Sequence, residues 1–336
     1  MNLDAASARA VIDASIAGGI NFADTARGYG SSEEKLGAGL KGRRDDFILA
    51  TKSPLRSAEG MRKAIDQSLR NFQTDYIDIY QVHSLKPGEL DRIFAPGGAM
   101  EALAAARDAG KIRFIGVTGH RPPVLVDAIR TGEFDTVQAP INVVDRESED
   151  ELLPLAKKMD VGILAMKPIC GGTLDNPQLG IRFSLNSLTD LVLCGMKNVA
   201  EVDANLETVR SFTPLSPVEE DKLLEEATQL GNQFCRRCEY CQPCPEGLKI
   251  PRILWLANYH ARGNRWTEME YQSLEADAKN CEECGECEEK CPYELPIREM
   301  LKQADRELTP TTKVVAKRKV RKLVDKLIPG RKPYSS

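Results

Sequence analysis

Eight of the ten cysteines lie in two short runs in the C-terminal third of this 336-residue chain, and their spacing limits the fold more than any other feature. Each run has gaps of two or three residues between cysteines and ends in a cysteine followed by proline. Short gaps of this kind are typical of metal ligands, whereas disulfide frameworks belong to small exported chains. We therefore expect the two runs to hold metal. The eight residues are Cys235, Cys238, Cys241, Cys244, Cys281, Cys284, Cys287 and Cys291.

The second run has the spacing Cys-x2-Cys-x2-Cys-x3-Cys-Pro, which is the ligand pattern of a cubane 4Fe-4S cluster. In this pattern the cysteine before proline ligates a second cluster, so the run requires a partner. The first run supplies it, although its last gap is one residue shorter. We expect two 4Fe-4S clusters with exchanged ligands: Cys235, Cys238 and Cys241 with Cys291, and Cys281, Cys284 and Cys287 with Cys244.

Zinc is the main alternative metal, because zinc sites also use pairs of cysteines two residues apart. Each run here offers four cysteines rather than one pair, which favours iron-sulfur clusters over zinc or disulfides. The remaining cysteines, Cys170 and Cys194, lie singly in apolar stretches, where a free thiol usually behaves as a small buried hydrophobe.

From residue 5 to about residue 210 the chain alternates helical and strand patterns, which is typical of a parallel sheet with crossover helices. Seven short strands rich in Ile, Val, Leu and Phe are expected. Because a closed βα barrel has eight strands and the chain opens in a helix, we expect a (β/α)8-type barrel that lacks its first strand or is open. The expected strands are Ile20–Thr25, Phe47–Lys52, Tyr76–His83, Phe114–Thr118, Thr136–Asn142, Gly162–Lys167 and Leu191–Gly195.

The order of these patterns predicts two domains and a tail. We expect the barrel over residues 1–212, a proline-containing linker over 213–217, and a small α-helical two-cluster domain over 218–306. We expect residues 307–336 to form a basic tail with apolar residues at helical spacing. A solvated surface helix or a loose tail is favoured over binding to nucleic acid or to an acidic partner.

Composition excludes several classes of partner. The net charge is −4 from nearly balanced acids and bases, so no strongly charged partner is indicated. No apolar run is long enough to span a bilayer, and the N-terminus lacks the pattern of a signal peptide. We therefore expect a cytoplasmic protein that acts on a small molecule and has no membrane span, with room for a redox partner protein.

Polar or reactive side chains stand at the C-terminal ends of five expected strands: Asp24, Lys52, His83, Gln138 and Lys167. A βα barrel places its active site at that end of the strands. The sequence therefore predicts that these five residues approach one another.

Several of these residues lie in motifs that resemble those of the aldo-keto reductases, and with the cysteine runs the chain resembles the iron-sulfur branch of that family. The resemblance covers essentially the whole first domain. The motifs are Gly19-Ile20-Asn21-Phe22-Ala23-Asp24-Thr25-Ala26, Tyr29-Gly30, Ser32-Glu33, Leu36-Gly37, Thr51-Lys52 and Asp78-Ile79-Tyr80-Gln81-Val82-His83.

The resemblance implies an oxidoreductase with a catalytic tetrad of Asp24, Tyr29, Lys52 and His83. In such a tetrad Tyr29 gives a proton to the developing alkoxide, and the Lys52 ammonium assists by lowering the tyrosine pKa. Asp24 orients Lys52, and His83 binds the substrate oxygen or relays the proton.

The resemblance also implies NADPH or NADH as a cofactor, with contacts from Gln138, Lys167, Lys197 and Asn205. Two positions depart from the family pattern. The usual Ser-Asn pair is Thr118-Gly119, followed by His120, and the aromatic residue that stacks on nicotinamide is Met166. His120 is either a polar group at the rim of the active site or an ordinary loop residue. His260 is expected to pack inside the helical domain.

The sequence leaves three functions open. The leading hypothesis is carbonyl/alcohol redox in the barrel, coupled to electron transfer through the clusters. The alternative is a ferredoxin-like electron carrier that uses the barrel as a docking scaffold. In a third hypothesis the clusters are structural or sense redox conditions.

Overall fold

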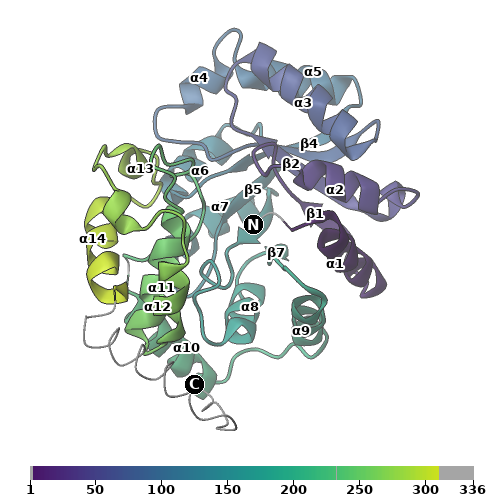
Figure 1. The fold of residues 1–336 in the computed structure, drawn as a ribbon. Coiled ribbons are helices and arrows are strands. Elements are labelled where there is room, and N and C mark those ends of the chain that lie inside the picture. Colours follow the sequence, from purple (N-terminus) through teal and green to yellow (C-terminus); the bar gives the residue numbers. More distant parts are fainter. Residues whose placement is uncertain (1–2, 232, 310–336) are drawn as a thin grey trace, which may run out of the picture. The chain divides into compact units, whose positions relative to one another are not determined.

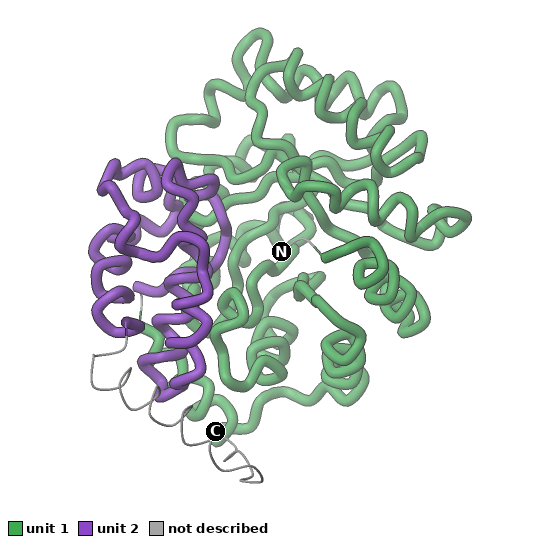
Figure 2. The backbone as a smooth tube through the Cα atoms, in the orientation of Figure 1, with its two compact units in different colours: residues 1–232 green, residues 233–336 purple. Residues whose placement is uncertain are grey.

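The structure, a computed structural model, describes residues 3–231 and 233–309 and divides into two compact units between residues 232 and 233. Figure 2 marks the units by colour. The first unit is the α/β barrel and the second is helical. The expected basic tail, including Lys313 to Lys332, lies outside the described residues from position 310 onward. Its expected start at residue 307 is too early, because α14 continues to Leu308.

Seven parallel strands form the sheet of the first unit, in the spatial order of the sequence from β1 to β7. Helices surround the strands (Figure 1). All seven expected strands are therefore confirmed. The strands are β1 Phe22–Asp24, β2 Ile48–Ser53, β3 Ile77–Val82, β4 Ile112–Thr118, β5 Thr136–Pro140, β6 Gly162–Met166 and β7 Leu191–Leu193.

The barrel is nearly closed, and the gap lies between β1 and β7. Among the described residues, each of these two strands pairs with one neighbour only. Outside the gap, α1 (Ala5–Ala17) and α9 (Val199–Arg210) pack together. A Cβ at Gly18 would lie 2.1 Å from Leu206 Cδ1, and Arg210 donates to the Gly18 carbonyl at 3.1 Å. The helix that precedes β1 thus contacts the helix that follows β7.

Amphipathic helices cover the strands because each buries one apolar stripe. Helix α3, for example, begins after Ser57, whose hydroxyl accepts from the Gly60 amide, and buries Met61, Ile65 and Phe72. The other helices of this unit are α2 Ser32–Gly39, α4 Leu90–Phe94, α5 Ala99–Asp108, α6 Pro122–Arg130, α7 Leu152–Lys158, α8 Pro177–Asn186 and α10 Pro217–Leu230. Helix α3 spans Ala58–Phe72, and the short 3₁₀ helices η1 and η2 span Arg44–Asp46 and Glu147–Glu149.

Helix α10 belongs to the barrel unit, so the expected domain boundary at 213–217 lies one helix too early. Arg182 on α8 fixes the segment before α10, because it pairs with Glu219 at 2.5 Å and donates to the carbonyls of Thr213 and Pro214. Further along α10, Glu226 accepts from the Asn176 amide. Proline in the 213–217 segment indicated a linker, and these polar contacts hold that segment on the barrel.

The second unit is a small helical domain with its own apolar core. Its core residues include Leu248, Ile253, Leu256, Tyr271 and Leu301, all buried. Two α-helices, α11 and α12, lie between the two cysteine runs. The elements are α11 Ile250–Ala261, α12 Trp266–Gln272, η3 Ala278–Asn280, α13 Glu286–Glu289 and α14 Ile297–Leu308.

Among residues 3–231 and 233–309, none of the helices has both the length and the apolar character that a bilayer crossing requires.

A buried carboxylate joins β2, α2 and α3 in the barrel unit. Glu33, on α2, is 1% exposed and accepts hydrogen bonds from Thr51 and Ser68 at 2.8 Å and from Asn71 at 2.9 Å. Its second oxygen also pairs with Arg27 at 2.5 Å. Because Arg27 lies on the same loop as Tyr29, this network fixes the loop that carries the predicted proton donor.

The substitution Glu33→Gln should destabilise the barrel by about 3 kcal/mol, because it leaves Arg27 without its buried counter-charge. Chemical denaturation followed by circular dichroism measures the change. The neighbouring substitution Glu34→Gln is the control, since Glu34 is exposed. Equal unfolding midpoints for the two variants would contradict the role of the network.

Candidate active site

A buried ion pair forms the floor of the candidate site. Lys52, near the end of β2, is 3% exposed and places Nζ 2.5 Å from Asp24 Oδ2, at the end of β1. The same nitrogen donates to the Thr25 carbonyl at 2.8 Å. Because β1 and β2 are parallel and adjacent, their C-terminal ends deliver both side chains to one point. The structure therefore brings Asp24 and Lys52 together as predicted.

Tyr29 and His83 lie beside this pair. The ring of Tyr29 meets the ring of His83 edge to face, with centroids 5.9 Å apart, and Lys52 Nζ lies 5.5 Å from the Tyr29 centroid. Tyr29 is 44% exposed, whereas His83 is buried. The four residues of the implied tetrad are thus gathered at one site, with the phenol on the solvent side and the ion pair beneath it.

The surroundings of His83 keep its imidazole neutral. Burial, together with the nearby charges of Lys52 and Arg56, lowers the pKa of His83 to about 3. Arg56 is buried and donates to the His83 and Ser84 carbonyls and to Glu89. A neutral imidazole both donates and accepts a hydrogen bond, so His83 is suited to binding an uncharged substrate oxygen.

Two glutamines complete the surroundings of Asp24. Gln81 donates to Asp24 Oδ1 at 3.2 Å, and Gln138, on β5, donates to Oδ2 at 3.5 Å. Sequence reasoning assigned no role to Gln81 or Arg56. Gln81 lies two residues before His83, and this period of two, which places side chains on one face of a strand, was the signal that could have found it.

The other residues predicted to contact the cofactor have hydrogen bonds and ion pairs away from the tetrad. Lys167 follows β6 with a left-handed φ of 61°, and its carbonyl accepts from Asn142. Lys197 pairs with Glu201 on the next helical turn at 3.3 Å. Asn205 donates to Cys194, whose pKa burial raises to about 11. Within the described residues these contacts tie Lys197 and Asn205 to their own segment of the chain.

His120 and the other departures from the family pattern lie near the same strand ends. Thr118 ends β4 and is buried, with its hydroxyl accepting from the Ser84 amide at 2.8 Å. His120 follows it and is half-buried. Met166, the last residue of β6, is also half-buried. His260 meets Thr267 at 3.2 Å within the helical unit, which agrees with the expected packing role.

Cysteines of the two runs approach one another in the second unit. A pocket is lined by Cys281, Cys284 and Cys287 of the second run together with Cys241 and Cys244 of the first. Cys241 also lies near Cys235 and Cys238, and burial and the charges of these two cysteines raise its pKa to about 12. Among the described residues, no three His, Cys, Asp or Glu side chains are arranged as ligands of one metal ion. A cubane differs in taking each of its cysteines at a separate iron.

The two cysteines outside the runs differ in their burial. Cys170 is fully buried and donates to the Asn142 side chain at 3.3 Å, and Cys194 is half-buried. Neither lies in the cysteine-lined pocket.

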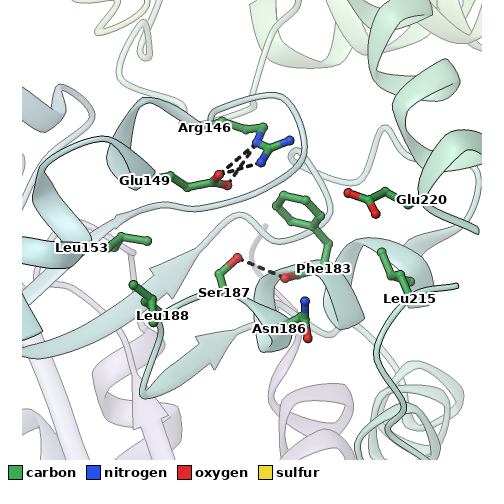
Figure 3. A pocket seen from close by; sticks show the side chains of 9 residues that line it. All are labelled: Arg146, Glu149, Leu153, Phe183, Asn186, Ser187, Leu188, Leu215 and Glu220. Carbon is green, nitrogen blue, oxygen red and sulfur yellow. Dashed lines mark hydrogen bonds and ion pairs between the residues drawn. The ribbon is translucent and has the colours of Figure 1, made fainter. Parts of the chain in front are cut away.

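The barrel unit also has a pocket of about 290 Å³ that is separate from the tetrad (Figure 3). Its lining includes Arg146, Glu149, Phe183 and Glu220, from η2, α8, α10 and the loop after β5. Arg146 forms a two-pronged pair with Glu149, which raises the arginine pKa, and its guanidinium lies 5.4 Å from the Phe183 ring centroid. None of the predicted site residues lines this pocket.

Comparison with known proteins identifies both units. The model of the Aldo/keto reductase family matches residues 2–180, and that of the 4Fe-4S dicluster domain matches residues 234–296. The chain belongs to the aldo-keto reductase family and carries a 4Fe-4S dicluster domain. It is therefore an oxidoreductase of a family that acts on small molecules.

Individual relatives agree with this assignment. L-galactose dehydrogenase of Arabidopsis thaliana is 31% identical over 244 residues, which cover 59% of this chain and 76% of the relative. NADH-specific methylglyoxal reductase of Escherichia coli (strain K12) is 31% identical over 182 residues, covering 46% of this chain and 54% of the relative. The holo form of an aldo-keto reductase from Bacillus halodurans superposes with a TM-score of 0.60 at 26% identity, over 67% of this chain and 88% of that one.

The lowered pKa of His83 gives a direct prediction. As pH falls from about 6.5, the unfolded chain takes up a proton at this residue before the folded chain does, so this contribution to stability is complete above pH 6.5 and is lost toward pH 3. Between about pH 6.5 and 4.5 the loss is about 2–3 kcal/mol.

Nuclear magnetic resonance of the full chain with labelled histidine tests this directly, because the chain has three histidines. The His83 signal, assigned by its loss in His83→Gln, should keep the neutral form down to about pH 4.5. A titration midpoint near 6.5 for that signal would contradict the burial argument.

Proposed function

We propose that the strand-end site interconverts a carbonyl and an alcohol in a small substrate, and that this reaction is coupled to electron transfer through two 4Fe-4S clusters in the second unit. The observation that carries the proposal is the buried Lys52–Asp24 pair at 2.5 Å beneath the exposed Tyr29, with neutral His83 alongside. This arrangement places a proton donor, a fixed positive charge and a neutral hydrogen-bond donor around one position.

Each tetrad residue has a distinct task in this proposal. Tyr29 donates its phenolic proton to the oxygen that becomes an alkoxide, and the ammonium of Lys52 stabilises the negative charge that develops. Asp24 balances Lys52 and fixes its position through the ion pair. His83 holds the substrate oxygen by a hydrogen bond from its neutral ring. In the reverse direction Tyr29 takes the proton back.

Gln138 supports a nicotinamide cofactor, which when bound supplies or removes hydride at the substrate carbon. Its Oε1 atom is buried and has no hydrogen-bond partner among the described residues. An orphaned carbonyl oxygen of this kind suits the N–H group of a carboxamide. The similarity to an NADH-specific reductase points to the same cofactor class. We assign Lys167, Lys197 and Asn205 as further contacts, which requires Lys197 and Asn205 to leave Glu201 and Cys194.

The exchanged ligand sets remain our proposal for the clusters, and two observations support them. Cys244 shares its pocket with Cys281, Cys284 and Cys287, and Cys241 also reaches this pocket. On the other side, the Arg236 guanidinium, next to Cys235, lies 4.5 Å from the ring of Tyr293, two residues after Cys291. The first run thus approaches the segment that follows Cys291, and the second run shares a pocket with the end of the first. Thiolates in these sets supply the negative charge that iron requires, although burial and neighbouring negative charges raise the pKa of Cys241 and Cys287 in the absence of iron.

Coupling the barrel reaction to the clusters requires that the numbers of electrons transferred match. Hydride carries two electrons, whereas each cluster accepts one, so the exchange needs a two-electron carrier such as a flavin, or a radical substrate. The chain therefore requires such a carrier or substrate, or a redox partner protein, for the complete reaction.

A second candidate function is favoured by the cofactor side of the barrel. Lys197 and Asn205 are tied to Glu201 and Cys194, and Met166 stands where the family has an aromatic residue. In this alternative the barrel is a docking scaffold and the second unit is a ferredoxin-like electron carrier. It predicts reversible cluster reduction with no nicotinamide binding.

The substitution Tyr29→Phe tests the leading proposal. Removal of the proton donor should lower kcat for reduction of methylglyoxal with NADH or NADPH at least about 100-fold. Tyr76→Phe is the matched control, because Tyr76 precedes β3 at the opposite end of the strand and bonds Asp45. Full activity in Tyr29→Phe would overturn the tetrad assignment. A methylglyoxal-inactive wild type would be assayed in the same way with L-galactose and NAD⁺ or NADP⁺.

A further inference from the structure

The two cysteine runs differ sharply in the charge of the residues between their ligands. Between Cys235 and Cys244 there are two arginines and one glutamate. Between Cys281 and Cys291 there are five glutamates and one lysine. Each cluster gains negative charge when it is reduced, so fixed charges beside it decide how readily it accepts an electron. The contrast therefore concerns the order in which the two clusters are reduced.

Arg237 acts on the first site in two ways. Its backbone amide donates to Cys235 Sγ at 3.4 Å, and hydrogen bonds to ligand sulfur stabilise the reduced state. Its guanidinium is half-buried, 5.5 Å from the Trp255 ring centroid, and close enough to Cys235 for the two charges to interact. The left-handed backbone of Arg237, with φ at 54°, is part of the loop that holds both groups there.

Arg236 adds a second positive charge, and this one is buried. It is 5% exposed, with its guanidinium 4.2 Å from the Phe234 ring and 4.5 Å from the Tyr293 ring. Its Nη1 atom donates to the Phe234 carbonyl at 3.0 Å. Low local polarity strengthens the field of a charge held between two rings. Glu239, the one acidic residue of this run, is exposed and acts through a more polar medium.

The second site is surrounded mainly by carboxylates. Glu282 and Glu286 line its pocket with the cysteines, and the Glu288 charge contributes to the raised pKa of Cys287. Three of the five glutamates pair with cations: Glu288 with Arg298, Glu286 with Lys290 and Glu283 with Lys302, at 2.7 to 2.8 Å. Even when these cations are counted, the second site keeps an excess of negative charge.

We infer that the two clusters differ in potential, and that the site of Cys235, Cys238 and Cys241 accepts the first electron while the site of Cys281, Cys284 and Cys287 accepts the second. The inference rests on the two clusters of the proposed function. Each oxidised cluster takes one electron from a one-electron donor, here dithionite, with no bond made or broken. Electrons that enter at the acidic site therefore move toward Arg236 and Arg237.

A redox titration of the cluster-replete full chain, followed by electron paramagnetic resonance and visible absorbance, tests this order. Iron and acid-labile sulfide are measured first, and eight of each per chain correspond to two cubanes. Wild type should show two one-electron steps. Arg237→Gln should move the higher step to lower potential, with about a tenfold loss of reduced cluster at a fixed potential near that step. Glu282→Gln should move the lower step upward.

Two controls separate charge from folding. Arg237→Lys keeps the positive charge and should retain the wild-type steps more closely than Arg237→Gln. Arg262→Gln removes an arginine that lies over Tyr259 in the same unit, away from the cysteine runs, and should change neither step. If Arg237→Gln fails to retain both clusters, the shift in Glu282→Gln decides the order by itself.

The outcomes distinguish this inference from the proposed function. Less than two clusters of iron and sulfide in wild type would overturn the two-cluster proposal and this inference with it. Two intact clusters with a single shared potential, or a shift of the lower step in Arg237→Gln, would overturn the assigned order alone. Opposite shifts of the two steps in Arg237→Gln and Glu282→Gln would support it.

Discussion

The ion pair between Lys52 and Asp24 is the interaction on which the barrel site depends. Burying an ammonium is costly unless a counter-charge and hydrogen bonds compensate it, and here Asp24 and the Thr25 carbonyl do so. The pair also joins β1, an edge strand of three residues, to β2. The same contact therefore holds the edge of the open barrel and places a positive charge under Tyr29. Burial of His83, together with the positive charges of Lys52 and Arg56, keeps its imidazole neutral.

The framework around this pair explains how an incomplete barrel keeps an ordered site. The gap between β1 and β7 lies next to the strand that carries Asp24, so the loop beyond β1 needs anchors of its own. Glu33 provides one through Arg27, Thr51, Ser68 and Asn71. On the outside of the gap, the close approach of α1 and α9 at Gly18 provides another.

Much of this architecture could be predicted from the sequence. The period-two apolar strands and the polar residues at their ends were sufficient for the seven strands and for the meeting of Asp24, Lys52 and His83, because parallel strands deliver their C-terminal ends to one edge. Helix α10 was assigned to the wrong unit, since its attachment depends on Arg182, a residue distant in sequence. The roles of Gln81, Arg56 and Glu33 were missed because they depend on burial and on partners that pattern does not reveal.

In the second unit the cysteine spacing, rather than a buried ion pair, defines the site. The spacing of its cysteines alone identified the cluster type, and the comparison with the 4Fe-4S dicluster domain agrees. Spacing does not show which charges lie near which thiolate. The contacts of Arg236 with Tyr293 and of Arg237 with Cys235 became visible only in the folded chain. These contacts turn two similar ligand runs into two unequal sites.

The central claim is that the barrel carries out hydride chemistry and that the clusters of the same chain exchange electrons with this reaction. An anaerobic titration of the cluster-replete chain with NADH and with NADPH, following nicotinamide fluorescence and cluster absorbance together, tests it most directly. The account predicts saturable binding of at least one nicotinamide, and bleaching of the clusters once a two-electron carrier such as free flavin is added. Absence of binding by both nicotinamides, with clusters that dithionite still reduces reversibly, would contradict it and identify the chain as an electron carrier on a barrel scaffold.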